Sequence, residues 1–128
     1  MNFLLDTHAL VWTAIDPSEL THSTRDLITN TPNEGVAVAD VTLLEIAILA
    51  HKNRIKLHRP LSELLTDLSR IYTILPINAA IAATAYELPL PQSDPFDRSI
   101  VATALYHKLP LITRDRHITA SNCVQTIW

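Results

Sequence analysis

The chain has 128 residues, of which 48% are hydrophobic and 18% charged, and this predicts a single domain over residues 1–128 with a sizeable core. Its formal net charge of −3 provides no overall attraction for nucleic acid, although metal ions in an acidic site would offset the charge locally. One glycine, one cysteine and no long apolar run exclude a glycine-rich phosphate loop, an internal disulfide framework and a membrane span, so we expect a cytoplasmic protein without membrane attachment.

Short apolar runs alternate with helical segments along the whole chain. We predict strands at residues 3–5, 35–39, 72–76, 110–113 and 123–128. We predict helices at residues 9–14, 23–30, 43–53, 60–68, 79–87 and 96–108. The helix at 43–53 is apolar almost all round, which indicates burial on more than one side. The alternation is typical of an α/β fold in which helices cover both faces of a mostly parallel sheet.

The first strand ends abruptly at a carboxylate. Phe3, Leu4 and Leu5 form an apolar run too short for an amphipathic turn, and Asp6 follows directly. In open α/β sheets, ligands gather at the carboxyl ends of the strands, where a charge needs a partner such as a metal ion or a basic group. Asp6 fits the N-cap of the following helix equally well, and this residue alone does not decide between the two interpretations.

Four acids are predicted to meet at this edge of the sheet: Asp6, Glu45, Asp97 and Asp115. Asp6 and Asp115 each close a short strand, whereas Glu45 and Asp97 each lie in the first turn of a helix. Strand C-termini and the N-termini of the following helices face the same way in a parallel sheet, so all four acids point to one crevice. Their joint placement favours a ligand site, because crowded carboxylates repel one another unless a divalent cation neutralises them.

Each of these acids also has a local interpretation. Residues 42–45 match a capping box, in which Glu45 bonds back to the Thr42 amide. Asp94 and Pro95 match an N-cap followed by proline at the first helical position, and Asp97 then favours the helix dipole. Asp115 fits an ordinary turn residue. If the acids do form a site, the absence of a Cys or His ligand set favours Mg²⁺ or Mn²⁺ over zinc.

Four segments, in this order, resemble the acidic motifs of the PIN-domain family. They are residues 4–12 (LLDTHALVW), 41–47 (VTLLEIA), 94–104 (DPFDRSIVATA) and 111–115 (LITRD). The match covers nearly the whole chain and is closest in kind to VapC-type toxins of toxin–antitoxin pairs. The resemblance implies a three-layer α/β/α sandwich with four to five short strands and a metal-dependent endoribonuclease. It also implies an RNA substrate, a cognate VapB-like antitoxin that holds the enzyme inactive, and a homodimer.

The resemblance assigns roles to individual residues. The catalytic set falls on Asp6, Glu45, Asp97 and Asp115. Asp6 and Asp97 are the expected ligands of Mg²⁺ or Mn²⁺, and the other two acids contribute directly or through water. Such an ion lowers the pKa of a bound water and orients it toward a phosphodiester. Asp94 is an additional acid in the third motif, so it competes with Asp97 for the role of ligand; we favour Asp97, which directly precedes the apolar helix.

Several residues near these motifs have supporting interpretations. The hydroxyls of Thr7 and Thr113 match positions that often line the site in the family. Arginines near the site are suited to grip flanking phosphates, and these are Arg98, Arg114 and Arg116. For any one of them, a solvated charge at a helix end or in a loop is the better interpretation. His8 is the only histidine close to a motif, and Trp12 is predicted to lie in the core.

Two other classes of protein are alternatives to the nuclease. The first is a PIN-like protein-interaction module that has lost catalysis, and the presence of all four acids argues against it. The second is a phospho-acceptor receiver domain, which expects paired acids after the first strand and a lysine after a late strand. Asp6 has no adjacent acid and Thr113 is followed by Arg114, so the receiver domain is disfavoured.

Overall fold

The computed structural model describes residues 1–90 and 94–128. Its centre is a sheet of five parallel strands in the order β3-β2-β1-β4-β5. The strands are β1 (Phe3–Leu5), β2 (Val36–Ala39), β3 (Thr73–Leu75), β4 (Leu111–Ile112) and β5 (Thr126–Ile127). The first strand of the chain is thus the middle strand of the sheet, which explains why it is wholly apolar and wholly buried. The predicted α/β fold with a parallel sheet of four to five short strands is confirmed.

Successive residues of β1 belong to two different cores, as the two-residue period of a strand requires. Phe3 and Leu5 face one core, where they pack with Leu10 of the first helix. Leu4 faces the other core and packs with Ile100. The sheet is therefore covered on both faces, and the predicted three-layer sandwich is confirmed.

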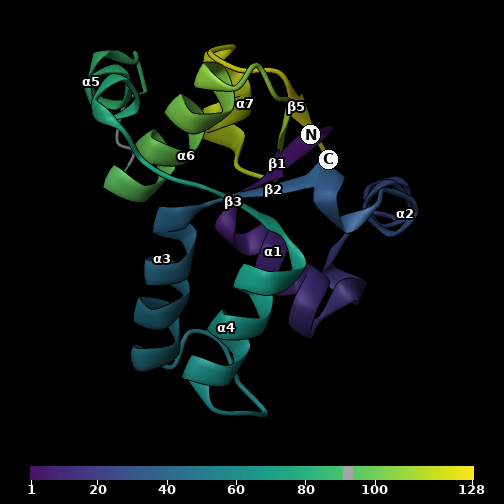
Figure 1. The fold of residues 1–128 in the computed structure, drawn as a ribbon. Coiled ribbons are helices and arrows are strands. Elements are labelled where there is room, and N and C mark those ends of the chain that lie inside the picture. Colours follow the sequence, from purple (N-terminus) through teal and green to yellow (C-terminus); the bar gives the residue numbers. More distant parts are fainter. Residues whose placement is uncertain (91–93) are drawn as a thin grey trace.

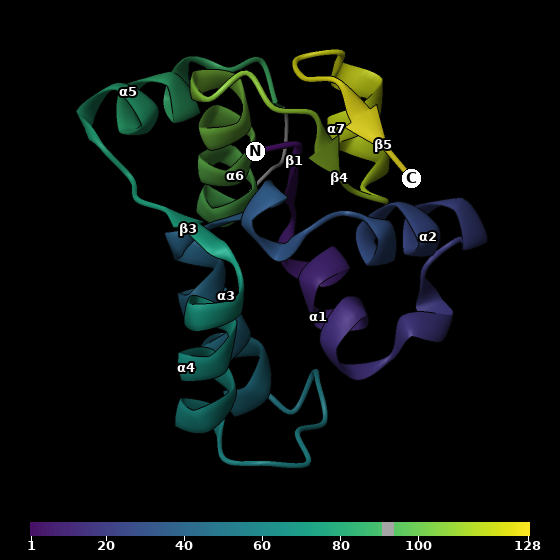
Figure 2. The ribbon, with the colours of Figure 1, turned by 45° about the vertical axis from the view of Figure 1, so that its right-hand side comes forward.

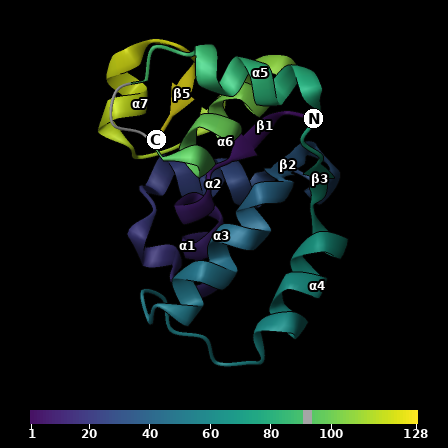
Figure 3. The same cartoon turned by 90° about the vertical axis from the view of Figure 1, so that its left-hand side faces the viewer.

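Helices from the two halves of the chain cover opposite faces of the sheet. The first group is α1 (Thr7–Ile15), α2 (His22–Asn30), α3 (Asp40–His51) and α4 (Leu61–Ile71), all of which contribute to the Phe3 core. The second group is α5 (Ala79–Glu87), α6 (Pro95–Tyr106) and α7 (Arg116–Ser121). Figures 1 and 3 show α1, α3 and α4 on one side of the strands and the second group on the other. Figure 2 shows α2 beside α1. Two single 3₁₀ turns, η1 (Pro17–Glu19) and η2 (Asn33–Gly35), complete the connections.

The structure corrects two sequence-based expectations. Helix α3 begins at Asp40 rather than at residue 43, so Glu45 lies in its second turn. The helix packs against α1, α4 and α6, as its predicted burial on more than one side requires, although Leu44 is 58% exposed. Helix α7 was not predicted, because its six residues are too few to show a helical period. Within the described residues, no helix has both the length and the apolar character needed to cross a membrane.

Candidate active site

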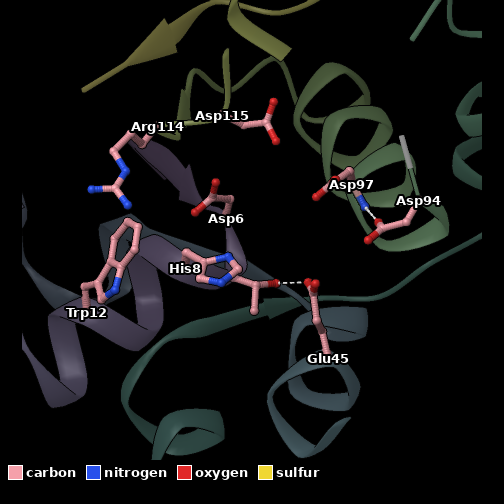
Figure 4. A pocket seen from close by; sticks show the side chains of 9 residues that line it. Asp6, His8, Trp12, Glu45, Asp94, Asp97, Arg114 and Asp115 are labelled. Atoms are coloured by element: carbon pink, nitrogen blue, oxygen red, sulfur yellow. Dashed lines mark hydrogen bonds between the residues drawn. The ribbon is translucent and has the colours of Figure 1, made fainter. Parts of the chain in front are cut away.

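A cavity of about 350 Å³ opens at the carboxyl ends of the central strands. Its lining residues come from four separate segments of the chain: Asp6, Thr7, His8, Trp12, Glu45, Asp94, Asp97, Arg114 and Asp115. The structure therefore brings the four predicted acids together at the predicted edge of the sheet, and Asp94 with them (Figure 4). Thr113 lies behind the cavity, where its buried hydroxyl accepts a hydrogen bond from the Asp115 amide at 3.0 Å.

Asp6 and Asp115 reach the cavity from the ends of neighbouring strands, β1 and β4. Each is also the N-cap of the helix that begins there. Oδ1 of Asp6 accepts a hydrogen bond from the Ala9 amide at 2.8 Å. Oδ1 of Asp115 accepts hydrogen bonds from the amides of His117 and Ile118 at 2.8 and 3.0 Å. The cap and the site interpretations are thus compatible, because capping commits one carboxylate oxygen of each residue and leaves Oδ2 outside the cap bonds.

The burial of Asp6 changes its acidity. Loss of hydration raises the pKa of the Asp6 carboxyl above its usual value, and the nearby charge of Asp115 raises it further. Hydrogen bonds from Thr113 and from the Ala9 amide oppose this shift because they stabilise the ionised form. A cation in the cavity would act in the same direction as those hydrogen bonds.

Glu45 reaches the cavity from α3 and makes a bond that the sequence did not suggest. The hydroxyl of Thr7, a buried residue, donates a hydrogen bond to Oε1 of Glu45 at 2.5 Å. The Thr7 hydroxyl also lies 3.2 Å from that of Thr42. Glu45 therefore does not form a capping box with Thr42. That interpretation was wrong because α3 begins two residues before Thr42, so Thr42 lies inside the helix and is not its N-cap. Burial is the main cause that raises the pKa of Glu45.

Asp94 and Asp97 lie at the start of α6 and have different environments. Asp94 is exposed and is the N-cap, with Oδ1 accepting a hydrogen bond from the Asp97 amide at 2.8 Å and Pro95 at the first helical position. This confirms the predicted cap. Asp97 is partly buried, and loss of hydration raises its pKa to about 7, with added repulsion from Asp94, Glu45, Asp115 and Asp6 in that order. A nearby positive charge would therefore stabilise the ionised form of Asp97.

The three arginines of the motifs have separate environments. Arg98 points away from the cavity and donates hydrogen bonds to the carbonyl oxygens of Ala85, Leu88 and Leu90, the first two at 3.0 Å. Its predicted contact with a phosphate is not supported, because its guanidinium joins α6 to the end of α5 and the segment that follows. Arg116 is exposed beside a second hollow, outside the acidic cavity.

Only Arg114 of these three lines the acidic cavity, and it lies on an aromatic surface. Its guanidinium carbon is 4.3 Å from the centroid of the Trp12 ring. Its Nη1 is 3.6 Å from Oε2 of Glu19. Trp12 is partly buried against the core, as predicted, but it also lines the cavity, which the sequence analysis missed. The four-residue spacing of His8 and Trp12 on one helix face was a signal that could have revealed this.

The donor set fits a hard divalent cation. Carboxylate oxygens are the ligands that Mg²⁺ and Mn²⁺ prefer, and the cavity holds five carboxylates without a cysteine. Across residues 1–90 and 94–128, none of the ion pairs of Lys or Arg involves one of these five. In the same described residues, no three acidic, His or Cys side chains are close enough together to hold an ion as they stand. A divalent ion here would be held by one or two of these carboxylates, with waters completing its coordination.

Comparison with known proteins defines the family. A model of the PIN domain matches residues 3–120, and the chain belongs to this family. Over 98% of its length it is 34% identical to Ribonuclease VapC22 of Mycobacterium tuberculosis, of which it covers 97%.

Solved structures share the fold at lower identity. DNA-bound VapBC from Salmonella typhimurium gives a TM-score of 0.73 at 17% identity, over 99% of this chain and 97% of that one. VapBC2 from Rickettsia felis, bound to a promoter DNA fragment, gives 0.72 at 16% identity, over 100% and 99% of the two chains. VapC20 of Mycobacterium tuberculosis, a toxin that cleaves the sarcin–ricin loop, gives 0.66 at 15% identity, over 94% and 95%. These likenesses establish the fold.

Proposed function

We propose that this chain is a metal-dependent endoribonuclease and the toxin of a toxin–antitoxin pair. The observation that carries the proposal is the meeting of Asp6, Glu45, Asp97 and Asp115 in one cavity at the carboxyl edge of a parallel sheet. The relative named a ribonuclease supports the activity, because it is similar over almost the whole of both chains. We also propose that residues 1–128 form a single PIN domain.

The carboxylates divide the work in this proposal. Asp6 and Asp97 hold Mg²⁺ or Mn²⁺, and Glu45 and Asp115 assist directly or through water. When bound, such an ion supplies a water of lowered pKa and charge stabilisation for hydrolysis of a phosphodiester. Thr7 keeps the Glu45 carboxylate turned toward the cavity through its hydrogen bond. Thr113 fixes the backbone of Asp115 and bonds to the Asp6 carboxylate, so it holds the two strand ends in register.

The partners of the proposed toxin follow from the same relatives. One solved structure with this fold is a toxin–antitoxin complex from Klebsiella pneumoniae, and others are VapBC and FitAB assemblies bound to DNA. We therefore propose a cognate VapB-like antitoxin, RNA as the substrate and a cytoplasmic location. The homodimer stays a prediction that light scattering on the purified protein can check.

Cleavage of single-stranded RNA by the purified chain tests the proposal. We expect cleavage with Mn²⁺ or Mg²⁺, no cleavage in EDTA, and recovery when the metal is restored. The control is the same chain with Asp6→Asn and Asp97→Asn together, which removes two carboxylates while keeping side-chain shape. Cleavage that survives both EDTA and this double substitution would contradict the proposal. Absence of cleavage by the folded wild-type chain on every RNA offered would favour the inactive interaction module.

A further inference from the structure

One wall of the cavity is aromatic and cationic, although the remainder is acidic. His8, Trp12 and Arg114 form this wall, and Trp128 packs against Trp12 while lining a neighbouring hollow. We call these four residues together the aromatic wall. The Trp12 and Trp128 rings meet edge to face with their centroids 5.7 Å apart, and the His8 ring lies 5.4 Å from Trp12. Figure 4 shows Trp12 and Arg114 across the cavity from Glu45, Asp94 and Asp97. These residues play no part in the carboxylate chemistry proposed above.

Two contacts hold the Arg114 guanidinium. Its central carbon lies over the Trp12 ring, 4.3 Å from the ring centroid, a distance typical of a cation–π contact, and it is 5.9 Å from the Trp128 centroid. Its Nη1 lies 3.6 Å from Oε2 of Glu19. The side chain is nevertheless 53% exposed. Arg114 is therefore a held guanidinium on an aromatic surface, with about half of its side chain open to solvent.

This geometry suits a flat ligand better than an additional anion. An anion such as a phosphate binds a guanidinium through its N–H edges, and here the Glu19 carboxylate, 3.6 Å from Nη1, places a negative charge beside one of those edges. The outer face offers a planar cation on which an unpaired nucleobase can stack, as bases do on arginine planes and aromatic rings in single-stranded RNA complexes. Trp12 supports that plane from behind, so little side-chain freedom is lost on binding.

The position of this face relates it to the reaction site. Arg114 directly precedes Asp115 in the chain, and both line the same cavity. A base on Arg114 therefore belongs to a nucleotide next to the phosphodiester that the carboxylates address. We propose that the outer face of Arg114, backed by Trp12, binds an unpaired nucleobase beside the scissile phosphate. This inference rests on the proposed ribonuclease function and adds a subsite to it.

The test is a binding cycle that needs no cleavage. The probes are a single-stranded RNA pentamer and an abasic pentamer with the same ribose phosphates. The proteins carry Asp97→Asn to keep RNA intact and Mn²⁺ is present throughout. Fluorescence reports on the aromatic wall selectively, because Trp12 and Trp128 are the two tryptophans of the chain. A Trp128→Phe background leaves Trp12 as the single reporter.

Removal of the bases should weaken binding about tenfold or more in the Arg114-containing protein, since stacking contributes strongly for each base. Arg114→Lys keeps the charge but not the plane, so it should weaken binding of the RNA pentamer similarly and that of the abasic pentamer less than about twofold. Trp12→Phe, made in the chain that keeps Trp128 as its reporter, should show the same selectivity with a smaller loss. Arg70→Lys, a matched change at an exposed arginine in the last turn of α4, should affect neither probe.

Equal weakening of both pentamers by Arg114→Lys would assign Arg114 to a phosphate and overturn the inference. The inference also fails if base removal leaves binding unchanged, or if neither pentamer binds. Melting of each variant checks that the fold is retained. Cleavage of the intact RNA by the wild-type chain, run alongside, tests the ribonuclease function by itself, so that failure of the subsite and failure of the function are distinguishable.

Discussion

The two carboxylates at strand ends differ from the two carried on helices, although all four share one cavity. Asp6 and Asp115 each hold the first turn of a helix through hydrogen bonds from backbone amides. Glu45 and Asp97 cap no helix: Glu45 bonds to a threonine hydroxyl, and Asp97 is raised in pKa to about 7 chiefly by burial. The strand-end acids therefore stabilise the fold by capping helices, whereas the helix-borne acids form no cap; burial raises the pKa of Asp6, Glu45 and Asp97 alike.

This difference predicts how the four acids respond to substitution. Loss of a helix-borne carboxylate should cost activity without costing stability, because it relieves repulsion and desolvation. Loss of a strand-end carboxylate should cost both, unless the replacement can still cap the helix. The following experiments test that division.

Asp97→Asn should show the largest loss of activity that carries no loss of stability. Removal of one charge at constant shape should lower cleavage by about 100-fold or more, while the melting temperature stays the same or rises. The matched control is Asp94→Asn, which removes the same charge three residues earlier and leaves a good cap. Cleavage and melting should be measured in parallel with Mn²⁺ present. An inactive Asp94 variant beside an active Asp97 variant would reverse the assignment, and equal loss in both would mean that the two acids share the metal.

Arg98→Met should have the opposite effect, a loss of stability without a loss of activity, because Arg98 stabilises the fold. It removes three hydrogen bonds to backbone carbonyls, so we expect the free energy of unfolding to fall by about 2–3 kcal/mol. Cleavage per folded molecule should stay within a few-fold of the wild type. Urea denaturation measures the first quantity and cleavage at a temperature well below unfolding the second. Unchanged stability with lost cleavage would restore the phosphate contact predicted from the sequence.

The raised pKa of Asp97 makes stability depend on pH. The unfolded chain releases this proton near the ordinary aspartate pKa of 3.8 and the folded chain near 7, so between these values the folded state binds more protons. The full shift corresponds to about 2.7 kcal/mol of stability lost by the metal-free protein as pH rises from 5 to 8. Because Asp97 is partly exposed and its charge is screened by solvent, we expect a loss of about 1–2 kcal/mol. The difference between wild type and Asp97→Asn isolates the effect from other titrating groups. An identical pH profile for both proteins would show that the pKa of Asp97 is not raised.

Substitutions of Asp6 distinguish its role as a helix cap from its proposed role in the site. Asp6→Asn and Asp6→Ala should both abolish cleavage, since neither side chain carries the charge. Asn can still accept a hydrogen bond from the Ala9 amide, whereas Ala cannot and should cost about 1 kcal/mol more in unfolding free energy. Thermal or urea unfolding of the two variants measures this difference. Equal stability would mean that the cap contributes nothing, and full cleavage by folded Asp6→Asn would remove Asp6 from the site.

The sequence predicted the parts of the molecule that depend on local pattern. Five apolar runs gave the strands, and the rule that ligands gather at the carboxyl edge of a parallel sheet predicted that Asp6, Glu45, Asp97 and Asp115 would meet. The order of the strands and the short helix α7 were not predicted, because neither produces a periodic signal in one sequence.

Contacts between side chains that are far apart in the sequence could not be predicted either. The bond from Thr7 to Glu45 joins residues 38 positions apart, and no local spacing indicates it. The three carbonyl contacts of Arg98 arise from the packing of α6 against the end of α5, so the basic residue looked like a candidate for phosphate binding. Arg114 and Trp12 meet only because β1 and β4 are neighbours in the sheet.

The central proposal is that the carboxylates of the cavity together bind one or two divalent ions. Calorimetric titration with Mn²⁺ at two pH values tests this binding most directly. Metal ligands must be deprotonated, so binding at pH 6 should release about one proton from Asp97, whose pKa is about 7, and much less at pH 8.5. Repetition in buffers of different ionisation enthalpy measures the release. Asp97→Asn should bind Mn²⁺ more weakly and lose the pH-dependent proton. Absence of Mn²⁺ binding, or binding with the same proton release in both proteins, would contradict the account.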